Sequence, residues 1–288
     1  KRSMDMTTLL NVDRVNKQYK DSDFKLQDAS LTISTNETVG LIGKNGSGKS
    51  TLINILVGNR HKDNGSIAFF GEEHAADDVE YKEHIGVVFD DLRVPNKLTI
   101  KDIDKVFQSI YTTWNSQKFF DLIKYFELPL QTKIKTFSRG MRMKIALTIA
   151  LSHDVKLLIL DEATAGMDVS GREEVMELLE DFVAQGGGIL ISSHISEDIE
   201  QLADKLVFMK DGRMILTEQK DILLAQYGIV TTGDKDVEIP KHLIIASRLS
   251  KGKYQILVKD YAEIENAEPL KHIDDATKII MRDRKSVV

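Results

Sequence analysis

The glycine-rich segment at residues 43–51 constrains this chain of 288 residues more than any other, because its positions hold the residue types that phosphate binding requires. Its three glycines can adopt backbone angles closed to other residues, so successive amide N–H groups can turn inward around a polyanion. Lys49 adds positive charge near the outer phosphates, and Ser50 offers a hydroxyl oxygen to Mg²⁺. The nine residues are Gly43, Lys44, Asn45, Gly46, Ser47, Gly48, Lys49, Ser50 and Thr51.

The flanks of this segment agree with a phosphate loop. Residues 37–42 form a short apolar stretch that predicts a strand, and a helix is predicted from Ser50 onward through residues 52–56. A helix that begins at the loop directs its positive dipole end at bound phosphates. The alternative is a chance Gly/Ser turn, but the match requires glycines, a lysine and a hydroxyl at fixed positions. The segment therefore predicts that the chain binds a nucleoside triphosphate.

The composition excludes several classes of protein. With 42% hydrophobic and 29% charged residues it is that of a soluble globular chain, and the absence of cysteine excludes disulfides and thiolate metal sites. A net charge of −6 argues against a broad nucleic-acid-binding face, because phosphate backbones are held mainly by Lys and Arg. The longest runs without charge, such as residues 145–153, reach nine residues, whereas a membrane-spanning helix needs about 20. We therefore expect no nucleic-acid partner and no direct membrane span.

Strand and helix patterns alternate along the chain and predict an α/β fold. Helical periodicity dominates residues 99–153, with the clearest segments at 114–126 and 141–150. A helix is also predicted at about 171–183, and a hairpin around the Asp-Gly turn at 211–212. Residues 1–5 are interpreted as an expression remnant before Met6. The predicted strands are residues 9–15, 24–33, 65–71, 85–89, 157–160 and 189–193.

Two adjacent carboxylates, Asp161 and Glu162, follow the apolar stretch 157–160. Such a strand carries acids to the carboxyl edge of a parallel sheet, where ligands of open α/β folds bind. Asp161 is expected to hold Mg²⁺, directly or through a water, and Glu162 to polarise the water that attacks the γ-phosphate. By itself an Asp-Glu pair after a strand is a common signal for the start of a helix. The phosphate loop upstream favours the catalytic interpretation.

With the phosphate loop and the acid pair in this order, residues 6–216 resemble the nucleotide-binding subunit of an ATP-binding cassette (ABC) transporter. The segment Phe137-Ser138-Arg139-Gly140-Met141 stands where that family has its Leu-Ser-Gly-Gly-Gln signature, and Ser138 and Gly140 match. The resemblance implies that Ser138, Arg139, Gly140 and Met141 close over a γ-phosphate bound by a second subunit. A plain helix cap by Ser138 is the simpler interpretation of the same segment.

The same resemblance assigns roles to three more residues. It implies that Tyr19 stacks on adenine, that Asp168 lies in a loop crossing the dimer interface, and that His194 senses the γ-phosphate and holds the attacking water. Taken alone, Tyr19 would be a surface tyrosine and His194 a structural residue at a strand end. Glu162 and His194 are thus the expected catalytic residues. The expected nucleotide ligands are Tyr19, the nine residues of the phosphate loop, Asp90, Ser138, Arg139, Gly140, Met141 and Asp168.

Asp90 departs from the family pattern, which has glutamine after the apolar stretch at 85–89. A carboxylate can still ligate Mg²⁺, so Ser50, Asp90 and Asp161 are the expected metal ligands. The added negative charge beside a polyphosphate predicts that ATP affinity depends on Mg²⁺ more steeply than in a glutamine version. Arg139 of the opposite subunit would offset that charge. The alternative is that Asp90 points to solvent.

The resemblance implies a P-loop NTPase fold of the ABC type, with an antiparallel β-subdomain, a parallel-sheet core and a helical subdomain at about 96–153, all within an ATPase domain at 6–216. Residues 217–288 lie outside the resemblance. Their pattern predicts a small C-terminal α/β accessory domain. A helix is predicted at 221–227, strands at 243–246 and 254–258, and an amphipathic segment near 272–281.

The function that the resemblance implies is ATP hydrolysis coupled to transport, with ATP and Mg²⁺ as cofactors. A homodimer or heterodimer around two ATP molecules would drive a separate integral-membrane permease at the inner face of a bacterial cell membrane. The segments 137–141 and 88–91 resemble single-cassette exporters of the antibiotic and antimicrobial-peptide type, including phenol-soluble modulin exporters. Two alternatives stay open: a soluble ABC ATPase of an intracellular assembly or DNA machine, and a non-hydrolysing nucleotide-binding module.

Overall fold

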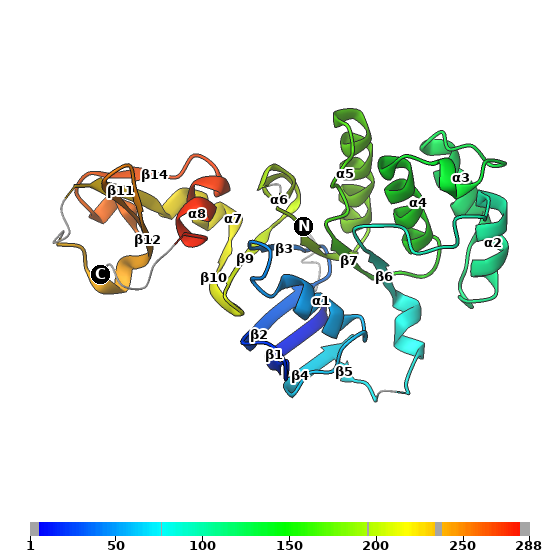
Figure 1. Cartoon of the computed structure of the whole chain (residues 1–288), viewed down its shortest axis with the longest axis horizontal. Coiled ribbons are helices and arrows are strands. Elements are labelled where there is room, and N and C mark those ends of the chain that lie inside the picture. Colours follow the sequence, from blue (N-terminus) through cyan, green and yellow to red (C-terminus); the bar gives the residue numbers. More distant parts are fainter. Residues whose placement is uncertain (1–5, 76, 195, 234–237, 283–288) are drawn as a thin grey trace.

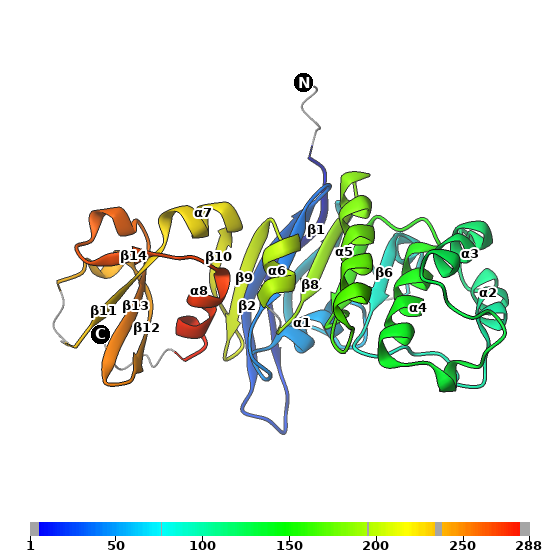
Figure 2. The ribbon, with the colours of Figure 1, turned by 90° about the horizontal axis from the view of Figure 1, so that it is seen from above.

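The computed structural model describes residues 6–75, 77–194, 196–233 and 238–282. The segment interpreted as an expression remnant, residues 1–5, lies outside these ranges. The described chain forms one ten-stranded sheet and a separate four-stranded sheet. The small sheet lies at one end of an elongated molecule, and a group of helices lies at the other end (Figure 1, Figure 2).

The large sheet combines an antiparallel part with a mostly parallel part. The antiparallel part contains β1 (Thr8–Gln18), β2 (Lys25–Ser34), β4 (Asn64–Phe69) and β5 (Glu72–Glu73). The other strands are β3 (Thr38–Ile42), β6 (Ile85–Val88), β7 (Leu157–Asp161), β8 (Gly188–Ser192), β9 (Lys205–Lys210) and β10 (Arg213–Gln219). Their order is β5-β4-β1-β2-β10-β9-β3-β8-β7-β6.

Four neighbouring strands of this order, β3, β8, β7 and β6, run parallel to one another. Their carboxyl ends therefore lie at one edge of the sheet. Every residue of β3 and β8 is buried, which is typical of parallel strands covered on both faces and explains their nearly continuous apolar sequences. The six predicted strands are confirmed to within three residues at either end.

Helices flank the sheet, and one group of them forms the end of the molecule remote from the small sheet (Figure 2). They are α1 (Lys49–Leu56), α2 (Ile100–Gln108), α3 (Ser116–Tyr125), α4 (Arg139–Leu151), α5 (Val169–Ala184), α6 (Ser196–Leu202), α7 (Lys220–Gln226) and α8 (Ile273–Ile280). Local sequence explains several starts: Thr99 and Asp102 form a capping box on α2, and Asn115 caps α3. The first helix begins at Lys49, one residue before the predicted start.

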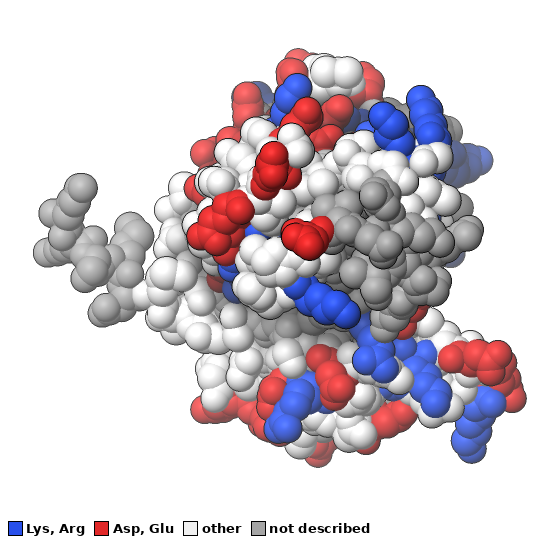
Figure 3. Space-filling model, turned by 90° about the vertical axis from the view of Figure 1, so that its left-hand side faces the viewer, with Lys and Arg blue, Asp and Glu red and all other residues white. Residues whose placement is uncertain are grey.

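The small sheet follows α7 in the chain. It is antiparallel, with the order β12-β13-β11-β14. Its strands are β11 (Gly228–Thr232), β12 (Ile244–Ser250), β13 (Lys253–Val258) and β14 (Ala267–Pro269). The sequence predicted β12 and β13, with β12 shorter than observed, and missed β11 and β14. On the face shown in Figure 3, acidic and basic side chains are interspersed at this end of the molecule.

The remaining helix predictions agree with the structure except for α6, which the sequence did not indicate. Helix α6 has seven residues and therefore only two turns, which is too short for helical periodicity to be recognised in the sequence. The predicted hairpin joins β9 to β10, and both turn residues, Asp211 and Gly212, have the positive φ of a two-residue turn. Within the described ranges, none of the helices combines the length and apolar character needed to cross a bilayer.

Candidate functional site

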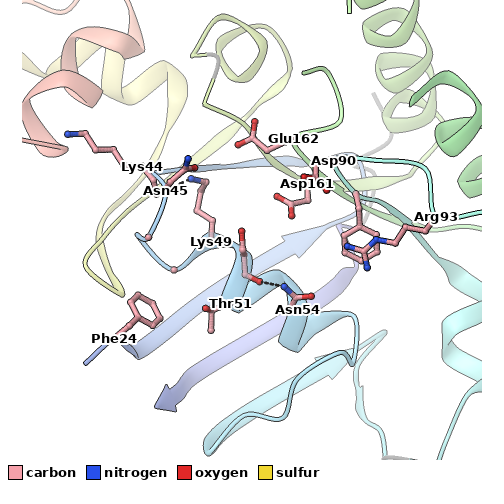
Figure 4. A pocket seen from close by; sticks show the side chains of 14 residues that line it. Phe24, Lys44, Asn45, Lys49, Thr51, Asn54, Asp90, Arg93, Asp161 and Glu162 are labelled. Carbon is pink, nitrogen blue, oxygen red and sulfur yellow. Dashed lines mark hydrogen bonds between the residues drawn. The ribbon is translucent and has the colours of Figure 1, made fainter. Parts of the chain in front are cut away.

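The carboxyl edge of the parallel strands opens into a cavity of about 420 Å³ (Figure 4). Segments from three of these strands reach it, because the phosphate loop follows β3, Asp90 lies beyond β6, and Asp161 ends β7. The cavity is lined by Phe24, Lys44, Asn45, Gly46, Gly48, Lys49, Ser50, Thr51, Asn54, Phe89, Asp90, Arg93, Asp161 and Glu162. Residues predicted for one chemistry from three distant parts of the sequence thus face the same space.

The phosphate loop has the backbone that its glycines allow. Gly46 and Gly48 have φ values of 85° and 110°, which residues with a side chain rarely adopt. Gly48 is also the N-cap of α1, so the helix directs its first N–H groups at the cavity. Ser47 lies behind the loop, where it is buried and its backbone N–H donates to the carbonyl of Lys44 at 3.0 Å.

Lys49 is the cation at the centre of this loop. It is 6% exposed, and its amine donates to the carbonyls of Gly43 and Lys44. Burial lowers the pKa of the Lys49 amine, and the nearby carboxylates of Glu162 and Asp161 partly counteract that shift. An anion entering the cavity would favour the protonated form further. By contrast, the side chain of Lys44 points away from the centre of the cavity (Figure 4).

Asp161 is held by the neighbouring strand. The hydroxyl of Ser192 on β8 donates to its Oδ1 at 2.6 Å, which fixes the carboxylate, and the Asp161 side chain lies among the residues of the cavity (Figure 4). Carboxylate and hydroxyl oxygens are ligands that Mg²⁺ accepts, and Ser50 and Asp90 line the same cavity. Among the described residues no three His, Cys, Asp or Glu side chains gather as a metal site. Carboxylate and hydroxyl oxygens of this kind suit a Mg²⁺ ion that takes further ligands from a phosphate and water.

Glu162 and His194 form a pair at the edge of the cavity. Glu162 Oε2 lies 2.6 Å from His194 Nδ1, and the backbone N–H of His194 donates to the same oxygen at 3.3 Å. Glu162 has a φ of 55°. This backbone conformation is unfavourable for any residue other than glycine, and it recurs at functional sites. His194 itself does not line the cavity. The carboxylate is therefore oriented from outside by the imidazole.

Phe89 and Phe24 are the aromatic residues that line the cavity, and the sequence did not single out Phe24 as a residue of the nucleotide site. Its ring lies beside the phosphate loop, where a side chain at Gly48 would approach the Phe24 Cζ to 3.1 Å. Tyr19 does not line the cavity and lies with its ring 5.7 Å from Lys17 Nζ. Both aromatics belong to the turn region between β1 and β2, so the alternation of a strand could not tell which one faces the loop.

Asp90 lines the cavity together with a cation that the sequence also did not indicate. The guanidinium of Arg93 stacks over the ring of Phe89, with 3.7 Å from its Cζ to the ring centroid (Figure 4). This cation–π contact holds positive charge next to Asp90 within the same chain. An Arg four residues after an apolar stretch carries no signal by itself, because only the bend of the chain after β6 brings it into the cavity.

The segment after Asp90 is fastened to helix α4. Arg142 Nε lies 3.0 Å from Asp91 Oδ1, and its other nitrogens donate to Asn96 and to the carbonyl of Leu92. The hydrogen bond from Arg142 lowers the pKa of the Asp91 carboxyl. The Arg142 side chain therefore connects this segment directly to α4.

Four predicted nucleotide ligands, residues 138–141, lie at the start of α4 and do not line the cavity. Ser138 caps the helix, since its hydroxyl accepts the N–H of Met141 at 3.2 Å. Arg139 packs against the loop after β7, where a side chain at Gly166 would lie 2.7 Å from Arg139 Cδ. Asp168 caps α5 and also lies away from the cavity. Residues 138–141 and 166–168 thus form one joint surface, here called the signature surface.

Comparison with known proteins identifies what this arrangement is similar to. The family model described as ABC transporter matches residues 26–165, from β2 to beyond the acid pair. The "Lantibiotic transport ATP-binding protein SrtF" of Streptococcus pyogenes is 34% identical over 223 residues, which are 74% of this chain and 92% of the relative.

Solved structures agree with these relatives. An ATP-binding subunit of an ABC transporter superposes with a TM-score of 0.70 and 26% identity, covering 75% of this chain and 92% of that chain. A dimeric ATP-binding cassette in a post-hydrolysis state with ADP and Pi gives a TM-score of 0.65 over 74% of this chain and 99% of that one, at 21% identity, which shows the fold alone.

Substitution can decide which aromatic residue stacks on the adenine base of ATP. We expect Phe24→Ala to weaken ATP binding by about 1 to 3 kcal/mol, because that is the range for stacking of a base on an aromatic ring. Equilibrium titration of the variant with ATP measures the loss. Inorganic tripolyphosphate, which has no base, should bind the variant and the wild type equally. A large loss in Tyr19→Ala with none in Phe24→Ala would assign the base to Tyr19 instead.

The negative charge of Asp90 should change how ATP affinity depends on the Mg²⁺ concentration. We expect Asp90→Gln to bind ATP several-fold more tightly than wild type at low Mg²⁺ and equally at saturating Mg²⁺. One unit charge about 4 Å away is worth about 1 kcal/mol in water, and Mg²⁺ neutralises the repulsion. Arg93→Gln should shift the low-Mg²⁺ affinity in the opposite direction. Asp91→Asn, an adjacent acid outside the cavity lining, is the control, and superimposable wild-type and Asp90→Gln curves would refute the idea.

Proposed function

The chain belongs to the ABC transporter family as an ATP-binding and ATP-hydrolysing subunit, and from this premise we propose that it closes with a second ATPase subunit around two Mg²⁺–ATP molecules and drives a separate membrane permease. The proposal of a dimer rests on a single observation, which is the position of the signature surface. It lies outside the cavity of its own chain, although it has the capped helix start that favours an anion.

The exposure of the signature surface supports the same conclusion. Ser138, Arg139 and Asp168 are exposed, and Val169 beside them has 72% of its surface open to solvent. Exposed side chains at the N-termini of two helices, α4 and α5, suit the phosphates of a nucleotide held by another subunit. Each ATP would then be an interface ligand, bound by the cavity of one subunit and capped by the signature surface of the other.

Within one cavity the residues divide the work by position. Phe24 or Tyr19 would hold the base, and the phosphate loop would hold the phosphates through its N–H groups and Lys49. Ser50, Asp161 and Asp90 would supply oxygens to Mg²⁺, which neutralises phosphate charge when bound. The other proposed nucleotide ligands in the same chain are Gly43, Lys44, Asn45, Gly46, Ser47, Gly48 and Thr51. Those proposed across the interface are Ser138, Arg139, Gly140, Met141 and Asp168.

Hydrolysis would depend on the pair at the edge of the cavity. Glu162 accepts the proton of the attacking water, and His194 keeps the carboxylate oriented through the 2.6 Å contact described above. Binding of ATP draws the two subunits together, and loss of the γ-phosphate removes the bridging charge. The subunits then part, which is a shift between two arrangements that differ in their affinity for ATP.

An apolar groove of about 380 Å³ supports docking of a permease. It lies between the end of α1, the short helix η1 (Glu80–His84) and the turn after α2. Val79 and Ile110 at the groove are 61% and 56% exposed, although they are large apolar residues. Such a groove suits an amphipathic helix of a membrane protein. The proposed location is the cytoplasmic face of a bacterial membrane, reached through the permease.

The cargo is proposed to be a peptide, antibiotic or other amphipathic molecule that is exported. This rests on the lantibiotic transport protein SrtF, to which the chain is similar along most of its length. The proposed domain division is an ATPase domain at 6–216, with its helical subdomain at about 96–153, and an accessory domain at 217–288. The small sheet and its two helices lie within the last of these ranges.

Glu162→Gln tests the dimer directly. The amide cannot accept the proton from water, so ATP should bind without turnover and the closed dimer should accumulate with Mg²⁺–ATP. Sedimentation velocity of the full chain, with and without nucleotide, measures the dimer. Adding Gly140→Asp to this variant provides the matched control: it keeps ATP binding but places a charge on the signature surface, and it should stay monomeric. Glu162→Gln that stays monomeric in solution and in vesicles with the permease would contradict the proposal.

Ile110→Glu tests the groove. An unpaired carboxylate in an apolar contact should cost the complex with the permease about 2 kcal/mol or more, which is a loss of roughly 30-fold in affinity. Co-purification of the full chain with its permease measures this, while the ATPase activity of the separate subunit should not change. Leu249→Glu is the matched control, because Leu249 is a similarly exposed apolar residue on the small sheet. Equal recovery of the permease with both variants would rule out the groove.

A further inference from the structure

Helix α6 follows the His194 segment and lies beside α8 of the C-terminal region (Figure 1, Figure 2). A carboxylate joins the two helices. Glu200 on α6 accepts a hydrogen bond from the backbone N–H of Ile273 at 3.0 Å, and its other oxygen lies 3.2 Å from His272 Nδ1. Ile273 is the first residue of α8, so the carboxylate satisfies a free N–H at the positive end of the helix dipole.

The contact between α6 and α8 extends beyond Glu200. At the start of α6, the hydroxyl of Ser196 donates to Asp274 Oδ1 at 3.1 Å. Between these two polar contacts, Ile199, Ile273 and Ile280 are fully buried in one apolar cluster. Because polar contacts flank an apolar centre, α6 cannot shift or rotate without disturbing α8.

The other faces of α6 contact the site and the sheet. Asp198 is buried and accepts a hydrogen bond from the hydroxyl of Thr164, in the loop that follows Glu162. Ile199 packs on Gly40 of β3, where an added Cβ would lie 2.6 Å from the Ile199 Cγ2. Three consecutive residues of one short helix therefore contact the loop after Glu162, the central strand and the C-terminal helix.

A cavity of about 220 Å³ lies between α8 and the phosphate loop. One wall carries Lys44 and His194, and the opposite wall carries Thr277, Lys278 and Met281. The end of α8 thus shares a cavity with Lys44 and His194, and Ser196 and Ile199 of α6 line the same cavity. The C-terminal region is positioned to influence the site through α6 and α8 together.

We propose that Glu200 is a positioning residue for ATP hydrolysis and that, through it, the C-terminal region sets the hydrolysis rate. By holding the N-terminus of α8, Glu200 fixes α6, and α6 fixes His194 against Glu162. The inference rests on the roles proposed above for His194 and Glu162. Nucleotide affinity is carried by the phosphate loop, which joins β3 to α1 and does not contact Glu200. A loosened α6 therefore lowers turnover and leaves ATP affinity unchanged.

Steady-state ATPase measurements on the full chain test this proposal. We expect Glu200→Ala to lower kcat by roughly tenfold, because small misplacements of a catalytic group cost up to about a hundredfold. KM and the affinity for ATP in equilibrium titration should stay at the wild-type values. Glu200→Gln should keep most of the activity, because its amide oxygen still accepts the N–H of Ile273. Glu197→Ala is the matched control: this glutamate is exposed on the same helix and should leave kcat unchanged.

Two results would overturn the proposal: a kcat for Glu200→Ala equal to that of Glu197→Ala, or a rise in KM with loss of ATP affinity, which would indicate general disruption. If Glu200→Ala does not fold, Ser196→Ala decides, since it removes the other polar contact and should lower kcat alone. His194→Ala separates this inference from the proposed function. If His194→Ala keeps wild-type turnover, the proposed role of His194 is refuted. If His194→Ala is inactive and Glu200→Ala has normal turnover, only the proposed coupling through Glu200 is refuted.

Discussion

The parallel pairing of β3, β8, β7 and β6 is the constraint on which the rest of this structure depends. Because neighbouring parallel strands end at the same edge, the loops that follow them meet there whatever their distance in the sequence. The phosphate loop, the segment of Asp90, the acid pair and the segment of His194 each follow one of these strands. A slip of one residue in any pairing would move every side chain of that strand to the opposite face of the sheet and shift a functional group by more than 3 Å, so the packing on both covered faces also fixes the geometry of the site.

Helix α4 links the signature surface to the cavity of its own chain. Its first residues belong to the signature surface that we propose to face a partner, and its Arg142 holds Asp91, next to the cavity of the same chain. In the proposed dimer, one rigid element would therefore join the nucleotide cavity of a subunit to the cap that it presents to its partner. The apolar groove lies at the other side of this helical region, against β6 and the turn after α2. A permease docked there would contact the strand whose end carries Asp90.

Helix α6 has the corresponding role on the opposite side of the site. Its contacts connect the acid pair, the strand that carries the phosphate loop and the C-terminal helix α8. None of these contacts could be predicted from the sequence, because α6 has too few residues for a periodic signal and its partners lie up to about 160 positions away. The same reason explains why Phe24 and Arg93 were missed. Each lines the cavity only through the bend of a turn, which no local sequence pattern predicts.

The sequence alone determined the parts whose chemistry depends on adjacent residues. The glycines and Lys49 of the phosphate loop, the acid pair at the end of an apolar strand and the Asp-Gly hairpin turn are each specified by local backbone requirements, and the strands are specified by apolar runs. The folded chain was needed to place Phe24 rather than Tyr19 at the cavity and to show that Arg93 accompanies Asp90. These facts depend on strand order and on the packing of helices against the sheet, which join residues that no local pattern connects.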